Sequence, residues 1–395
     1  MIESENEQKL FGTIKNRPED FVVDEIPLYD PCGEGEHLYL CVRKVGISHD
    51  LMNRLLVKEF GVKPNAIGTA GRKDRNAVTT QLVSIHLPRE AGQIPTFSHE
   101  GLEVLWHDLH TNKLRNGHLL ANRFDIRIRD IDPIKVTSLQ KQLETLSTSG
   151  LPNAFGVQRF GNDNNNHTMG AALITNNFEK LIEIIFSGTD RHHQLSMNGE
   201  YKKAFDAWPH GNPLQQQVLE GLSLGKEFSE ACKSISKSIQ KLWVNALQSF
   251  IFNQTLQRRQ EEGTWNTLLE GDLAWQHDGG GRTFLVSSED DLHERAVKIE
   301  LSPTGPLWGP KMRLPSGDVW KAELEELEKI GVRDVLQEND KRLAAGARRP
   351  LRVPVKNTVI GSGVDEHGGF VRVQFELPAG SYATVLIDEL LNASI

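Results

Sequence analysis

Segments typical of one-sided β-strands stand near both ends of this chain and enclose a long, mostly helical middle. Apolar and polar residues alternate at positions 38–42, 124–128 and 371–377, as in a strand with one face on a core. A mostly helical pattern begins near residue 150, and the pattern typical of strands returns after Arg349-Pro350. Since 395 residues also favour two domains, we expect an α+β domain built from residues 1–150 and 351–395. Residues 151–350 would form a helix-rich inserted domain.

Helix periodicity and end signals place several helices. Ser48 can cap a helix that runs to about Phe60 and ends at Gly61. Other helices are expected at about 136–146, 236–262 and 318–330. A hairpin with its turn at residues 278–282 is expected within 271–286, and residues 210–217 are interpreted as a loop.

Charge limits which partners the chain can bind. The formal net charge is −8, so a nucleic-acid role requires local basic patches. One patch is Lys113 to Arg129. The other contains Lys341, Arg342, Arg348, Arg349, Arg352 and Lys356. This second run fits either phosphate contact or a solvated linker. The acidic residues Glu323, Glu325, Glu326 and Glu328 are interpreted as a solvated helix face.

Several classes of protein are disfavoured. No run of 18 apolar residues suggests a membrane span, and the acidic N-terminus lacks signal-peptide character. The three scattered cysteines give neither metal spacing nor a disulfide framework, which favours a reducing, cytoplasmic setting. The pair His192-His193 is interpreted as a polar surface loop, without a metal site.

The stretch from Gly71 to Gln81 carries the chemistry. It places one carboxylate, Asp74, among the cations Arg72, Lys73 and Arg75. Neighbouring positive charge keeps a carboxylate ionised, and an ionised carboxylate can act as a nucleophile. The charge pattern alone favours a charged surface turn. On an extended segment Lys73 and Arg75 point away from Asp74, so their help requires a turn.

Two patterns about eighty residues apart give the chain a resemblance. The first is K-D-x-x-A-x-T-x-Q at 73–81, and the second is F-G-x-Q-R-F-G at 155–161. With them the chain resembles the TruD-type pseudouridine synthases, the family that modifies uridine 13 of tRNA. Further matching segments follow the family's order at 18–25, 33–37, 113–115, 122–124, 245–253 and 377–384.

The resemblance implies a fold and a set of site residues. The fold is a pseudouridine synthase domain with a mixed, mainly antiparallel sheet, interrupted by a large inserted domain. The nucleophilic aspartate corresponds to Asp74, with Lys73 and Glu25 in its neighbourhood. Asn122 and Phe124 would lie near the target base. Tyr382 keeps an aromatic where the family often has Phe, whereas Ala154 departs from a common aromatic.

The implied reaction is an isomerisation. It breaks the N1–C1′ bond of uridine, turns the uracil and forms a C5–C1′ bond, so no cofactor or metal is required. Phe124 and Tyr382 are candidates for stacking on the base, although Phe124 fits a core position equally well. Arg159 is a candidate phosphate contact. The expected partner is tRNA, bound by a monomer without a protein partner. The alternative is a non-catalytic RNA-binding protein on the same scaffold.

Overall fold

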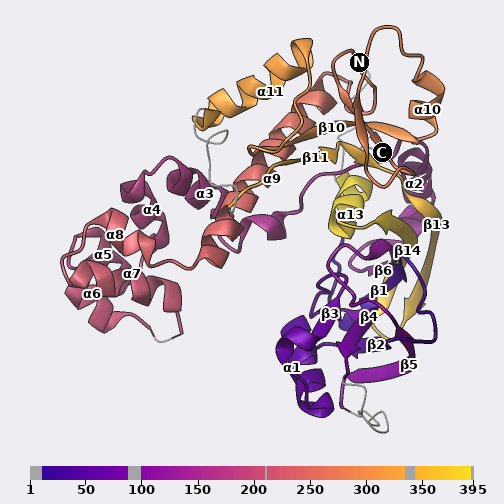
Figure 1. Ribbon diagram of the computed structural model, residues 1–395. Helices are drawn as coiled ribbons and strands as arrows, with labels where there is room; N and C mark the ends of the chain where they lie inside the picture. Colours follow the sequence, from indigo (N-terminus) through magenta and orange to yellow (C-terminus); the bar gives the residue numbers. More distant parts are fainter. Residues whose placement is uncertain (1–10, 88–98, 210, 334–342, 393–395) are drawn as a thin grey trace. The chain divides into compact units, whose positions relative to one another are not determined.

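The computed structural model describes residues 11–87, 99–209, 211–333 and 343–392 (Figure 1). The chain divides into two compact units, Met1–Leu151 with Val353–Ile395, and Pro152–Arg352. The sequence pattern placed the domain boundaries at residues 150 and 350. The assignment of catalysis to the first unit stays a prediction. The short strands β7 (Leu151–Pro152) and β12 (Arg352–Val353) mark the division.

The first unit is built on one mixed sheet. Its strand order is β13-β14-β6-β1-β4-β2-β5, with β3 beside β4. The pair β1–β4 is parallel, and the remaining pairs are antiparallel. The strands are β1 (Phe21–Pro27), β2 (His37–Val45), β3 (Ile67–Thr69), β4 (Val78–His86), β5 (Leu102–His110), β6 (Leu119–Ile128), β13 (Lys356–Asp365) and β14 (Gly368–Pro378). The α+β class expected from the sequence is confirmed.

Strand register gathers polar residues on one face of this sheet. Asn122 pairs with Glu25 between β6 and β1, and Val23 pairs with Thr79 between β1 and β4. Lys44 pairs with Thr79 between β2 and β4. Since Val23 and Glu25 are two residues apart, the four polar side chains leave the same face.

Within its described residues, the first unit has the α-helices α1 (His49–Phe60), α2 (Val136–Ser149) and α13 (Ala383–Asn392). The predicted ends of α1 are confirmed. The Ser48 side chain accepts a hydrogen bond from the Leu51 N–H at 3.1 Å, and Gly61 adopts the left-handed conformation with φ of 61°. Met52 and Leu56 of α1 pack onto the apolar residues of β2 and β4.

The second unit combines helices with a sheet of its own. Its helices are α3 (Asn166–Ile174), α4 (Phe178–Ile185), α5 (Arg191–Met197), α6 (Tyr201–Ala207), α7 (Pro213–Ser223), α8 (Phe228–Lys233), α9 (Lys237–Glu261), α10 (His293–Val297) and α11 (Gly317–Ile330). Helices α4 to α8 gather at one end of the unit (Figure 1), around a core that includes Leu181, Phe186 and Leu219. None of the helices in the described part of the chain has the length and apolar character needed to cross a membrane.

The sheet of the second unit is larger than the sequence predicted. Its order is β11-β10-β8-β9, from β8 (Leu273–Gln276), β9 (Thr283–Leu285), β10 (Leu301–Leu307) and β11 (Ala347–Pro350). The predicted hairpin is confirmed as β8–β9. Strand β10 escaped prediction because Pro303 and Pro306 argue against a strand.

The loop predicted at residues 210–217 is wrong from Pro213 onward. Helix α7 starts there with proline in its first turn, a position that proline tolerates because that N–H has no helical partner. Val218, Leu219 and Leu222 then bury one face of the helix. His210 lies outside the described residues.

Candidate active site

Asp74 lies in the loop between β3 and β4 and presents its carboxylate outward. Its side chain is 47% exposed, and its Oδ2 lies 2.5 Å from Lys15 Nζ. The Lys15 ammonium also lies over the Phe21 ring, 4.3 Å from the centroid. The carboxylate therefore has a cation on one side and solvent on the other.

The preceding residue, Lys73, points inward. Its Nζ donates to Asn122 Oδ1 at 2.7 Å and to Glu25 Oε1 at 3.2 Å. The other Glu25 oxygen accepts the Leu82 N–H at 3.0 Å. Burial raises the pKa of Glu25, against the opposing effects of Lys73 and the Leu82 N–H. Glu25 thus has both carboxylate oxygens engaged and a side chain only 2% exposed.

A second lysine lies beneath the loop, and the sequence analysis missed it. Lys44 is fully buried, and its Nζ donates to the main-chain carbonyls of Asp74 at 2.5 Å and Ile47 at 3.0 Å. A signal was present in the sequence. The alternation of Leu40 and Val42 continues to position 44, so a lysine there occupies a core-facing position.

The prediction that Arg72, Lys73 and Arg75 surround the Asp74 carboxylate is wrong. Arg72 pairs with Asp50 at 2.8 Å, and Arg75 donates to the Gly46 carbonyl at 3.4 Å. Among the ion pairs of the described residues, Asp74 is matched with Lys15, 59 positions earlier in the chain. The nearest sequence signal for Lys15 was its place just before the matching segment at 18–25.

The two aromatic candidates occupy different environments. The Phe124 ring is 6% exposed and stacks on Phe375 with centroids 5.2 Å apart, so it lies in the core of the sheet. Tyr382 is half-buried and precedes α13, where its carbonyl accepts the Val385 N–H at 3.1 Å. Stacking of either ring on a base stays a prediction.

Arg159 belongs to the second unit, so the structure does not group it with Asp74. It lies in the short 3-10 helix Val157–Phe160, is half-buried and donates from Nε to Ser249 Oγ on α9 at 3.1 Å. This bond fixes the stem of the side chain. Phosphate contact by Arg159 stays a prediction.

The basic run at 341–356 is not a solvated linker throughout. Arg348 forms two hydrogen bonds with the buried Glu323, at 2.8 and 2.6 Å. Arg352 is 3% exposed and donates to Ser302 Oγ at 3.1 Å. Neither the phosphate contact nor the solvated linker expected for this run applies to Arg348 and Arg352, because both side chains form hydrogen bonds inside the second unit. Lys341 and Arg342 lie outside the described residues.

The predicted patch from Lys113 to Arg129 also includes internally paired cations. Arg129 is 4% exposed and pairs with Asp20 at 2.6 Å and Asp365 at 2.7 Å. Arg127 pairs with Asp365 at 3.1 Å. Neighbouring acids therefore neutralise much of this patch.

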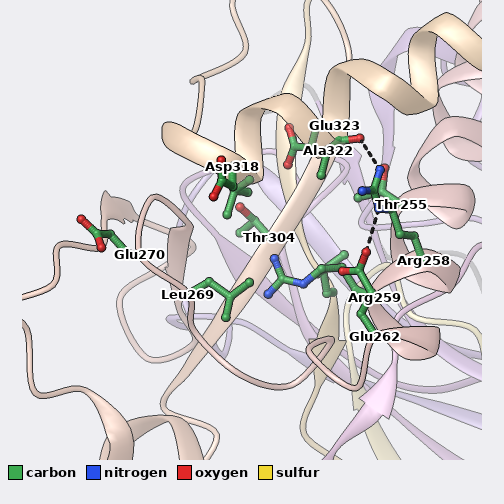
Figure 2. Close-up of a pocket in the computed structure, with 12 residues that line it drawn as sticks. Thr255, Arg258, Arg259, Glu262, Leu269, Glu270, Thr304, Asp318, Ala322 and Glu323 are labelled. Atoms are coloured by element: carbon green, nitrogen blue, oxygen red, sulfur yellow. Dashed lines mark hydrogen bonds and ion pairs between the residues drawn. The ribbon is translucent and has the colours of Figure 1, made fainter.

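A pocket of about 330 Å³ lies between α9, α11 and β10 of the second unit (Figure 2). Arg258 donates to Glu262 at 2.9 Å and to the Ala322 carbonyl at 3.3 Å, and dashed lines in Figure 2 mark interactions among the residues drawn. Beside Arg258, Arg259 pairs with Asp272 at 3.0 Å. Because both of these wall arginines are already paired with acids, the pocket is poorly suited to an anionic substrate.

The solvated face predicted for the glutamates of α11 is confirmed at Glu325 and Glu328, which are 54% and 50% exposed, and is wrong at the other two. Glu323 and Glu326 are 2% and 3% exposed. Glu323 pairs with Arg348, and Glu326 pairs with Lys329 at 2.7 Å. Burial raises the pKa of Glu323, against the opposing charge of Arg348. The sequence pattern of this acidic run did not indicate that two of its carboxylates are buried.

The surface loop predicted at His192-His193 is also wrong. Both residues lie in α5, and their rings pack against Trp208 with centroids 4.5 and 4.9 Å away. Asp190 lies next to them, with possible metal-ligand atoms of the three residues within 4.8 Å of one another. The packing of the two imidazoles on Trp208 accounts for their position without a metal.

Comparisons with known proteins agree over nearly the whole chain. The family model of tRNA pseudouridine synthase D (TruD) matches residues 4–390. The tRNA pseudouridine synthase D of Geotalea daltonii is 34% identical over 394 residues, covering 97% of each chain. That of a Thermus thermophilus strain is 34% identical over 381 residues, covering 96% of this chain and 89% of the relative.

A solved structure shows the same architecture. The crystal structure of the putative tRNA pseudouridine synthase D (TruD) from Methanosarcina mazei superposes with a TM-score of 0.80 at 27% identity. The match covers 98% of this chain and 95% of the other. The fold expected from the resemblance, a pseudouridine synthase sheet with a helix-rich insertion, is confirmed.

Proposed function

This chain belongs to the tRNA pseudouridine synthase D family, and we propose that it isomerises uridine 13 of tRNA with Asp74 as the nucleophile and without a cofactor. Membership makes it a tRNA pseudouridine synthase, an isomerase that converts uridine to pseudouridine in tRNA. The particular uridine, the role of Asp74 and the lack of a cofactor are the parts proposed.

The observation that carries the proposal is the contrast between two carboxylates near the same loop. The Asp74 side chain is 47% exposed, whereas that of Glu25 is 2% exposed with both oxygens engaged. A nucleophile has to reach C1′ of the ribose, and a general base has to reach the proton on C2′. The exposure of Asp74 supports either route, and the burial of Glu25 suits a residue that positions Lys73.

The ion pair with Lys15 supports the same assignment. Lys15 Nζ lies 2.5 Å from Asp74 Oδ2, so a cation is in place beside the carboxylate that either route uses. On the nucleophile route, an Asp74 oxygen bonds to C1′ as the N1–C1′ bond breaks and leaves its electron pair on the uracil. C5 of the turned uracil then attacks C1′ and displaces Asp74 as a free carboxylate. On the general-base route, Asp74 takes the C2′ proton as the base leaves and returns it when the C5–C1′ bond forms. The proton on C5 then leaves for N1 or water, so electrons and atoms balance without a cofactor.

The remaining candidates would hold the base and the RNA. The Asn122 amide, fixed by Lys73 at 2.7 Å, can meet a uracil edge. A base stacked on an aromatic ring gains about 1–3 kcal/mol and stays free to turn. The half-buried Tyr382 suits this role better than Phe124, whose ring already stacks on Phe375. Arg159 is our candidate for a phosphate contact that offsets the few kcal/mol needed to unstack the uridine.

The test is Asp74→Asn, which keeps the size of the side chain. We expect tritium release from tRNA carrying 5-tritiated uridine to fall by on the order of 10⁴-fold or more. The melting temperature should stay near that of the wild type, because a half-exposed ion pair contributes about 0–1 kcal/mol. Asp50→Asn, at an exposed carboxylate that pairs with Arg72, is the control and should keep full activity. An active Asp74→Asn enzyme refutes the role of Asp74.

Two further measurements test the rest of the proposal. A tRNA transcript with cytidine in place of uridine 13 should release no tritium from its other uridines. Activity should survive dialysis against a chelator followed by gel filtration. Release from the altered transcript would move the target, and a loss of activity restored by added metal would contradict the cofactor-free route.

A further inference from the structure

We propose that Lys44 is a positioning residue that holds the main chain of Asp74 from inside the sheet, so that its carboxylate faces the substrate. The inference rests on the proposed role of Asp74. It adds a residue that would act on the reaction without contacting the tRNA.

The burial of Lys44 is the first argument. Its side chain is fully buried on the face of β2 that also carries Leu40 and Val42. Burying an ammonium is costly unless hydrogen bonds compensate for lost water. A leucine or valine would fill the same core position without that cost, so the charge calls for an explanation in what it binds.

The acceptors of Lys44 supply that explanation. One N–H donates to the carbonyl of Asp74 at 2.5 Å, and another donates to the carbonyl of Ile47 at 3.0 Å. Ile47 belongs to the turn between β2 and α1, and Asp74 to the loop between β3 and β4. A single ammonium on β2 thus ties the loop to the turn that follows β2, at the residue whose side chain is proposed to react.

Three lysines hold the loop that carries Asp74, each through a different contact. Lys73 anchors it by its own side chain to Glu25 and Asn122. Lys15 binds the Asp74 carboxylate from outside, and Lys44 binds the Asp74 carbonyl from inside. A substrate ribose whose C1′ approaches Asp74 competes with Lys15 for the carboxylate but leaves Lys44 in place. Lys44 can therefore keep the main chain fixed throughout the reaction.

The buried position makes this support sensitive to pH. Burial lowers the pKa of Lys44 to about 8, with Lys73 adding to the fall and Asp74 opposing it. Among the described residues, His49 of α1 also interacts with Lys44, and burial lowers its pKa from 6.5, so it stays neutral in this range. Above pH 8 Lys44 loses its charge, and a neutral amine is a weaker donor to the Asp74 carbonyl.

Lys44→Met tests the proposal against Arg43→Met. Arg43 precedes Lys44 on β2, but its side chain is exposed on the opposite face. We expect Lys44→Met to lower kcat by about 10²-fold, the effect of misplacing a reacting group by about 1 Å, with KM for tRNA within about twofold of the wild type. The wild type and Arg43→Met should lose kcat as the pH rises through about 8, and Lys44→Met should lack this fall. Any titration of the substrate is common to all three proteins.

Lys44→Arg separates a positioning role from mere stability. A guanidinium stays protonated through this range, so this variant should recover much of the lost kcat and should also lack the fall near pH 8. Wild-type kcat in Lys44→Met, or a fall near pH 8 that persists in both Lys44 variants, overturns the proposal. If Lys44→Met does not fold, a wild-type kcat that stays constant from about pH 7 to 9 relative to Lys44→Arg overturns it. Failure of the proposed function appears separately, as an active Asp74→Asn enzyme.

Discussion

The loop at Asp74 and the pair Arg348–Glu323 of the second unit both join a carboxylate to a cation, but to different degrees. Arg348 and Glu323 share two hydrogen bonds, and their side chains are 3% and 2% exposed. Asp74 and Lys15 share one contact, and their side chains are 47% and 17% exposed. Complete pairing away from water fixes a structure. Partial pairing at the surface leaves a carboxylate within reach of a substrate.

The largest effect that we expect is a loss of stability when the buried pair of Arg348 and Glu323 is broken. Glu323→Ala leaves the Arg348 guanidinium buried without its partner and should lower the free energy of unfolding by about 3–5 kcal/mol. Urea denaturation of the full chain measures this loss. The control is Glu325→Ala on the same helix, where the carboxylate is 54% exposed and the loss should stay below about 1 kcal/mol. Equal losses of unfolding free energy in the two variants would show that burial does not determine how much these ion pairs contribute to stability.

A somewhat smaller effect, on activity, is expected when the pair of Lys15 and Asp74 is broken. Lys15→Met removes the cation that faces the Asp74 carboxylate and should lower kcat/KM by about 10²–10³-fold, the range for loss of one electrostatic contact in an active site. The free energy of unfolding should change by no more than about 1 kcal/mol, because the pair is partly exposed. Tritium-release kinetics and urea denaturation of the same preparation give both values. A variant that loses stability but keeps kcat/KM would place Lys15 with the structural pairs.

The smallest effect is expected at Arg72, which lies two residues from Asp74. Its guanidinium and the Asp50 carboxylate are 71% and 66% exposed, so Arg72→Gln should change stability by less than about 0.5 kcal/mol. Its kcat should equal that of the wild type. A KM for tRNA that rises with a weaker dependence on salt would instead assign Arg72 to a phosphate.

Local signals predicted the features of this molecule that depend on neighbours in sequence. Helix α1 begins at its Ser48 cap and ends at Gly61, because both signals act within one turn. The hairpin β8–β9 follows from its glycine-rich turn in the same way. The polar loop that carries Asp74 was also visible as a cluster of charges in the sequence.

Pairings between distant residues could not be predicted in this way. The partner of Asp74 was expected among the adjacent cations, yet Lys15 comes from a separate segment ahead of β1. Glu323 was interpreted as solvated because its partner, Arg348, lies 25 positions away on another element. Charge patterns along a chain show which residues need a partner, and only the fold determines which partner each one meets.

The discontinuity of the first unit has a consequence for synthesis on the ribosome. Strand β6 borders β14, and β14 is translated only after the whole of Pro152–Arg352. Until then β6 exposes an unpaired edge, which can pair with another nascent chain. Phe124 meanwhile lacks the ring of Phe375 that covers it in the finished protein. The second unit is continuous in sequence and can fold during this delay, so the sheet of the first unit closes last.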